Sequence, residues 1–277
     1  MPRPRPRPAW HAVAVSVAGS GHRARGLPCQ DASDVVVLPD GTLLAAVADG
    51  AGSAPCSAEG ARLAVGTALH VLWDALDGPG PHDVPAALTE AFRAARDVIA
   101  EVAAAAGRPA RDYAATLLVA VAAADALHVA QTGDGAIVVR DAAGGLAAAT
   151  LPQNGEYANE TFFVTTPGGD GPRFRATLPA AAGLALTTDG LLPIAVDLAT
   201  TAPHAPFFAP LLAYVAAEPD DAARGGLARF LAADRVASRV DDDLTLVLAV
   251  PRAAADPPPE PDHARHADRV ADRAPRR

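Results

Sequence analysis

The segment "LLAAVADGAGSAPCSAEGARLAV", residues 43–65, joins an apolar run to a helical pattern through Asp49-Gly50. The aliphatic residues before Asp49 predict a buried strand, and the apolar residues after Ser57 recur at steps of three and four, as in an amphipathic helix. Asp-Gly is a common hairpin turn, because glycine accepts a positive φ and aspartate tolerates one. No second strand follows Asp49-Gly50, however, so a hairpin does not explain why this strand ends on a carboxylate.

The chain repeats this strand ending at two other places. "LHVAQTGDGAIVV" ends a run at Asp134-Gly135, and "LALTTDGLL" ends one at Asp189-Gly190. "QDAS" and "VDDDLTLV" add Asp31 and residues 241–243 beside apolar segments. Carboxylates from distant segments meet at one sheet edge only if something offsets their repulsion, and divalent cations do so. Hard oxygen ligands favour Mg²⁺ or Mn²⁺ over zinc, and the sequence has no His/Cys cluster with zinc spacing.

The order of the predicted elements indicates an α+β fold, in which helices cover two stacked antiparallel sheets. Two helices follow the first strands, and one or two more precede the last strand. The strands between residues 113 and 141 are expected to form an antiparallel meander, and 141–183 to form loops and short strands. The predicted strands are 11–19, a hairpin of 34–38 and 43–48, 113–123, 126–133, 136–141, 183–190 and 242–251, and the predicted helices begin at Ser57 and cover 85–107 and parts of 206–234.

Length and composition predict one domain between two disordered ends. The 277 residues are 50% hydrophobic, which is enough for a substantial core. Residues 10–251 are expected to form the domain. The Pro- and Arg-rich ends, 1–9 and 252–277, carry too little apolar content to offset the entropy of ordering.

Charge and hydropathy exclude two classes of partner. The formal net charge is −9; the first eight residues contribute +3 and the last 26 contribute +1, which leaves −13 for residues 9–251. Such an acidic core argues against binding nucleic-acid phosphates. No run of about 18 apolar residues predicts a membrane span. Two cysteines give no disulfide framework, so the cytoplasm is the expected compartment.

Five motifs, in this order, resemble those of the metal-dependent serine/threonine protein phosphatases of type 2C: "QDA", "VADGAGSAPCSAEGARLA", "TGDGAIVVR", "LTTDG" and "DDDLTLVLA". The resemblance covers about residues 10–251 and favours the compact bacterial subgroup, to which "GEYANETFF" (155–163) also points. It implies a four-layer α-β-β-α sandwich and hydrolysis of phosphoserine and phosphothreonine in proteins. The implied cofactors are two Mn²⁺ or Mg²⁺ ions that activate a water molecule, and a bacterial serine/threonine kinase is the implied opposing enzyme.

The resemblance also implies a role for each carboxylate. Asp49 corresponds to the aspartate that bridges two ions, with the Gly50 carbonyl as a further ligand. Asp189 corresponds to a second-site aspartate, and Asp242 to the aspartate of a terminal Asp-Asn pair whose asparagine is Asp243 in this chain. The expected catalytic residues are Asp49, Asp189 and Asp242, and the expected metal ligands are Asp31, Asp49, Gly50, Asp134, Asp189 and Asp242, with Asp134 serving a third, weaker ion.

Arg23 or Arg25 is the expected phosphate-binding residue, since a guanidinium makes forked contacts with phosphate oxygens. Two departures from the family pattern leave another function open. Gln30 stands where the family usually has glutamate, and Ala51 where many eukaryotic members have a histidine that protonates the leaving group; His22 is a candidate substitute whose location the sequence does not fix. A catalytically weak or inactive binding module is therefore the alternative, and a small-molecule phosphatase on the same fold is a third hypothesis.

Overall fold

The computed structural model describes residues 10–150, 152, 161–168, 171–197 and 199–252. The expectations for the two ends, 1–9 and 253–277, and for residues 155–160 of "GEYANETFF" concern residues outside these ranges. No helix within the described ranges is long and apolar enough to cross a membrane.

One antiparallel sheet of five strands pairs the start of the described chain with its end. β1 and β12 pair along their full length, with Val13 opposite Leu248. β12 also pairs with β9, and β9 with β6. In order across the sheet the strands are β1 (Trp10–Val17), β12 (Leu244–Pro251), β9 (Gly183–Thr187), β6 (Ala136–Arg140) and β7 (Leu146–Ala148).

A second antiparallel sheet of five strands packs against the first. The predicted hairpin is confirmed, because β2 pairs with β3 and places Val35 opposite Ala45. In β3, Leu43, Ala45 and Val47 face the other sheet, whereas Leu44, Ala46 and Ala48 face the helices, which explains why this strand is apolar on both faces. In order the strands are β2 (Ala32–Val37), β3 (Leu43–Ala48), β4 (Leu117–Ala122), β5 (Ala126–Thr132) and β8 (Phe174–Pro179).

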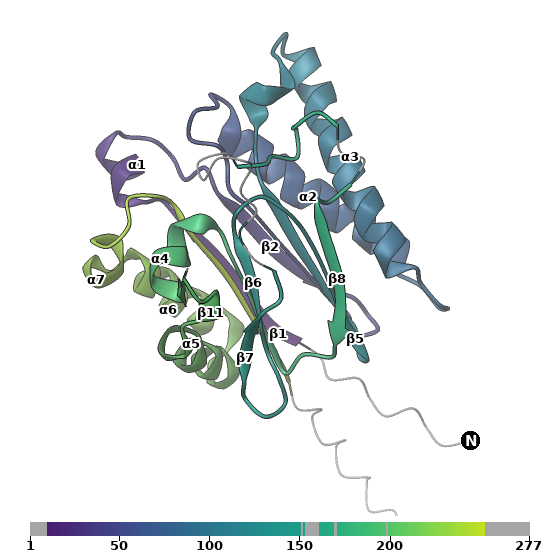
Figure 1. Ribbon diagram of the computed structural model, residues 1–277, viewed down its shortest axis with the longest axis vertical. Helices are drawn as coiled ribbons and strands as arrows, with labels where there is room; N and C mark the ends of the chain where they lie inside the picture. Colours follow the sequence, from purple (N-terminus) through teal and green to yellow (C-terminus); the bar gives the residue numbers. More distant parts are fainter. Residues whose placement is uncertain (1–9, 151, 153–160, 169–170, 198, 253–277) are drawn as a thin grey trace, which may run out of the picture.

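Helices cover the outer face of each sheet and complete the four layers (Figure 1). Helices α2 (Ser57–Leu76) and α3 (Val84–Ala105) cover the sheet that contains β3, and α5 (Ala205–Ala217) and α6 (Asp220–Ala232) cover the other. The predicted α+β sandwich is therefore confirmed. The remaining short elements are α1 (Ser20–Ala24), η1 (Ala110–Tyr113), η2 (Asp189–Leu191), α4 (Leu192–Ala195), β10 (Val196–Asp197), β11 (Ala202–Pro203) and α7 (Asp234–Ala237).

The predicted meander is wrong, because β5 and β6 belong to different sheets. β5 pairs with β4 and β8, whereas β6 pairs with β9 and β7. The chain crosses between the sheets at Gly133-Asp134-Gly135, where Gly133 adopts a φ of +121° that a side chain would rarely allow. A second difference is α1, which follows β1 and is not among the predicted helices. The crossover places Asp134 between the two sheets.

Candidate metal centre

The sheet topology brings the acidic strand ends together at one end of the sandwich. Because neighbouring strands are antiparallel, the carboxyl end of one strand lies beside the amino end of the next. Asp49 follows β3 and lies at the same end as Asp31, which precedes the paired strand β2. Asp189 follows β9 closely and lies at the same end as Asp242, which precedes the paired strand β12.

Three carboxylates, which follow the three strands β3, β5 and β9, approach one another closely. One ligand oxygen from each of Asp49, Asp134 and Asp189 lies within 4.8 Å of the others. Thr161 donates a hydrogen bond of 2.6 Å to Oδ2 of Asp134. Oδ1 of Asp134 is buried and has no hydrogen-bond partner among the described residues. Oxygen donors at this spacing fit a hard divalent cation such as Mn²⁺ or Mg²⁺.

Burial and mutual repulsion disfavour the negative charge of these carboxylates. Burial, followed by the charges of Asp31 and Asp189, raises the pKa of Asp49 well above its usual value. Burial raises the pKa of Asp31 to about 6, although a 2.8 Å hydrogen bond from Thr188 partly opposes it. Burial also raises the pKa of Asp189 to about 7, with the charge of Asp134 as the next cause. A bound cation would relieve this repulsion.

Asp243, which the resemblance aligns with an asparagine, ties two distant segments together. Its side chain is buried, at 2% exposure. Oδ1 accepts a 2.7 Å hydrogen bond from the Gly19 N–H and lies 2.7 Å from Nδ1 of His22, and Oδ2 accepts a 2.6 Å bond from the Gln30 N–H. The carboxylate therefore fixes the segment that carries α1 to the start of β12. The sequence did not locate His22, and the structure places it, buried, beside Asp242.

Ala51 and Gln30, the two other positions where the sequence differs from the pattern that it resembles, lie in different surroundings. Ala51 is buried in a small apolar cluster with Ala54 and Ala114, against which Phe163 packs. Oε1 of Gln30 is buried and has no hydrogen-bond partner among the described residues. A Cβ atom on Gly50 would lie 2.6 Å from the Gln30 carbonyl oxygen, so the glycine permits a close approach between these two backbone segments.

A cavity of about 500 Å³ opens beside the carboxylates. Of the two predicted phosphate-binding residues, Arg25 lines this cavity, whereas the guanidinium of Arg23 donates to the Ala18 carbonyl. Sequence reasoning missed Arg239, whose only signal was its position three residues before Asp242. The residues that line the cavity are His22, Arg25, Gly52, Asp189, Gly190, Pro193, Arg239, Val240, Asp241 and Asp242.

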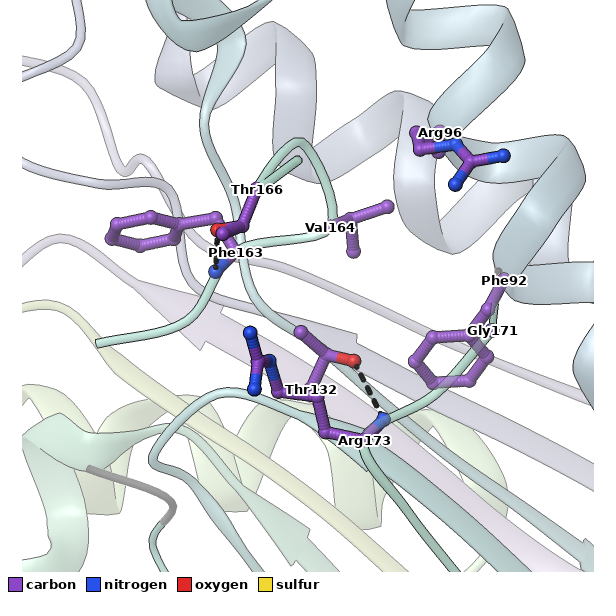
Figure 2. A pocket seen from close by; sticks show the side chains of 8 residues that line it. All are labelled: Phe92, Arg96, Thr132, Phe163, Val164, Thr166, Gly171 and Arg173. Carbon is purple, nitrogen blue, oxygen red and sulfur yellow. Dashed lines mark hydrogen bonds between the residues drawn. The ribbon is translucent and has the colours of Figure 1, made fainter. Parts of the chain in front are cut away.

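A second, much smaller cavity lies beside the segment that follows Thr161, and hydrogen bonds around it hold that segment in place. The cavity of about 20 Å³ lies between α3 and residues that include Phe163, Thr166 and Arg173, with Phe92 and Arg96 on the helix side (Figure 2). The Phe163 N–H donates to Thr166 at 3.0 Å, and the Arg173 N–H donates to Thr132 of β5 at 3.3 Å (Figure 2). This space holds about one water molecule, so it is a packing feature and not a substrate site.

Comparisons with known proteins agree with this architecture. The family model described as Protein phosphatase 2C matches residues 18–232. Serine/threonine-protein phosphatase 3 of Escherichia coli (strain K12) is 36% identical over 252 residues, which cover 87% of this chain and 98% of that protein.

Two solved structures share the fold. Serine/threonine phosphatase Stp1 from Staphylococcus aureus has a TM-score of 0.63 and 14% identity, over 91% of this chain and 100% of that one. The catalytic domain of the serine threonine protein phosphatase PstP, in complex with two manganese ions, has a TM-score of 0.61 and 21% identity. That similarity covers 88% of this chain and 99% of that one.

Proposed function

The chain belongs to the protein phosphatase 2C family, and we propose that it hydrolyses phosphoserine and phosphothreonine in proteins with two divalent ions, Mn²⁺ or Mg²⁺. The observation that supports this most strongly is the convergence of Asp49, Asp134 and Asp189, whose oxygens lie within 4.8 Å of one another. The raised pKa values of Asp31, Asp49 and Asp189 fit a site that is completed by positive charge.

Each residue of the site has a role in the proposal. The carboxylates would hold two ions, which would supply an activated water molecule and positive charge at the phosphoryl oxygens. Arg25 binds the phosphate, since it lines the cavity and its guanidinium is held by a 3.0 Å bond from Nε to the Gly21 carbonyl. The proposed ligands are Asp49, Asp189 and Asp242, with Asp31 and the Gly50 carbonyl in support and Asp134 for a third, weaker ion.

The similarity to a serine/threonine-protein phosphatase supports a protein substrate. The cavity volume of about 500 Å³ lies in the usual range for ligand sites, which is enough to admit a phosphorylated side chain. The proposal takes a serine/threonine kinase as the enzyme that supplies the substrate, and the cytoplasm as the compartment in which both act.

A catalytically inactive binding module is the second candidate, and Gln30 and Ala51 favour it. Neither side chain carries the charge or the proton donor that the family pattern has at that position.

Phosphate release from a phosphothreonine peptide, measured with Mn²⁺ and with EDTA, separates the two functions. Release that requires Mn²⁺ supports the phosphatase. A folded protein that releases no phosphate, and binds no Mn²⁺ by calorimetry, would favour the binding module.

A further inference from the structure

A second arginine lines the cavity beside the metal centre. Arg239 follows α7 and lines the same cavity as Arg25, Asp189 and Asp242. Arg25 and Arg239 are both exposed. Within the described part of the chain, the guanidinium of Arg239 makes no hydrogen bond or ion pair. An exposed positive group without a partner that lines a cavity favours an anion from outside.

The two arginines stand on segments that are bonded to each other. The Gly21 N–H donates to the Asp241 carbonyl at 2.9 Å, and the Gly19 N–H donates to Asp243 at 2.7 Å. Arg25 is bonded to the carbonyl of Gly21. These bonds connect the segment of Arg25 with the segment of Arg239, so the backbones that present both cations are positioned before a substrate arrives, which lowers the entropy lost on binding.

The acidic groups of the cavity do not cancel the charge of Arg239. Asp189 and Asp242 are proposed metal ligands, and bound ions would neutralise them. Asp241 also lines the cavity, but its Oδ1 accepts a 3.2 Å hydrogen bond from Ser20, and among the described residues it forms no ion pair with Arg239. Because the whole chain is acidic, with a net charge of −9, an acidic substrate is attracted only where arginines such as these face the solvent.

We propose that Arg239 binds a carboxylate side chain next to the phosphorylated residue, so that the preferred substrates are phosphoproteins with Asp or Glu beside the phosphoserine or phosphothreonine. This inference rests on the proposed phosphatase function, in which Arg25 holds the phosphate itself. Arg239 is then a specificity residue: it contacts the substrate outside the reacting group and acts on KM more than on kcat.

Three phosphothreonine peptides of equal length test the proposal. One has glutamine on both sides of the phosphothreonine, one has glutamate before it, and one has glutamate after it. Measured with Mn²⁺, the wild-type protein is expected to favour one glutamate peptide by about fivefold in kcat/KM, the upper range for an exposed ion pair. The preference arises from KM and weakens as salt is added.

Variants of Arg239 assign the preference to this side chain. Arg239→Ala is expected to remove it, Arg239→Lys to retain most of it, and Arg239→Glu to turn it into a preference for the glutamine peptide. Arg235→Ala is the matched control, because Arg235 is exposed on the adjacent helix α7 but stacks on the Phe230 ring, 5.3 Å from its centroid. The control is expected to keep the wild-type preference.

Each result has a distinct meaning. Equal kcat/KM for all three peptides, or a preference that persists in Arg239→Ala, overturns the inference but leaves the phosphatase function standing. A wild-type preference that does not respond to salt also overturns it, whatever the variants do. No metal-dependent release from any of the peptides, nor from p-nitrophenyl phosphate, overturns both the inference and the proposed function.

Discussion

Asp243 is a buried carboxylate whose two oxygens accept hydrogen bonds from backbone N–H groups. Its two oxygens receive the N–H groups of Gly19 and Gln30, and Nδ1 of His22 lies 2.7 Å away. An asparagine offers one acceptor oxygen where the carboxylate offers two. Asp243 therefore accepts hydrogen bonds from the segment between β1 and β2 through two oxygens, whereas the amide of an asparagine would accept them through one.

Asp243→Ala is expected to lower the free energy of unfolding by about 3 kcal/mol, because each buried donor left without an acceptor costs about 1–3 kcal/mol. Urea denaturation measures this change. Asp74→Ala is the control, since Asp74 is exposed on α2, and it should change stability by less than about 0.5 kcal/mol. Equal denaturation midpoints for the two variants would show that Asp243 does not anchor the segment.

Single residues of the site could be predicted only where a local pattern marks them. Asp49, Asp134 and Asp189 each end an apolar run and are followed by glycine, and the structure brings these three together. Arg239 has no such mark. Its position in the cavity depends on contacts between residues more than 200 positions apart, such as Gly19 with Asp243, which no local pattern contains.

The two glycines of α2 provide a test at the scale of one helix. A Cβ on Gly60 would lie 2.0 Å from the Tyr113 carbonyl oxygen, whereas a Cβ on Gly66 would have nothing within 4 Å. Gly66→Ala is expected to raise the free energy of unfolding by about 0.5–1 kcal/mol, because alanine favours the helix. Gly60→Ala is expected to lower it by about 1–3 kcal/mol, because α2 must move away from η1.

Thermal or urea denaturation of both variants checks this pair. Stabilisation by Gly60→Ala would contradict the close packing of α2 against the turn at η1.

Elements with a strong periodicity were predicted well, and so was the pairing of the hairpin β2–β3, but the pairing of β5 with β6 was not. The helices at Ser57–Leu76 and Val84–Ala105 follow the three- and four-residue spacing of their apolar positions. Alternation or a continuous apolar run identifies a strand but not its partner. The meander expected from residues 113 to 141 therefore failed at Gly133-Asp134-Gly135, where the chain leaves one sheet for the other. That crossover is what places Asp134 beside Asp49 and Asp189.

At the scale of the whole molecule, the carboxylate cluster links stability to pH and to metal. Burial raises the pKa of Asp31 to about 6 and that of Asp189 to about 7, above the ordinary value of 3.8. The folded state therefore binds these protons more tightly than the unfolded chain does. Their stabilising contribution is fully present below about pH 4 and is lost as the pH rises through about 6 to 7.

We expect the metal-free protein to lose thermal stability from about pH 4 to about pH 7, and Mn²⁺ to restore it mainly at the higher pH, where the ligands are ionised. Unfolding temperatures measured with EDTA and with Mn²⁺ across this range check both effects. Asp189→Asn cannot ionise, so it should show a smaller loss with EDTA and a smaller gain with Mn²⁺. An equal gain from Mn²⁺ at pH 5 and pH 8 would be inconsistent with this linkage.

The most direct test of the metal centre is hydrolysis of p-nitrophenyl phosphate with Mn²⁺, compared between the wild type and Asp189→Asn. Asp74→Asn serves as the exposed carboxylate control. We expect the wild type and the control to be active with Mn²⁺ and inactive with EDTA, and Asp189→Asn to lose at least about 100-fold in kcat/KM. Wild-type activity in Asp189→Asn, or activity that survives EDTA, would contradict hydrolysis at this metal centre.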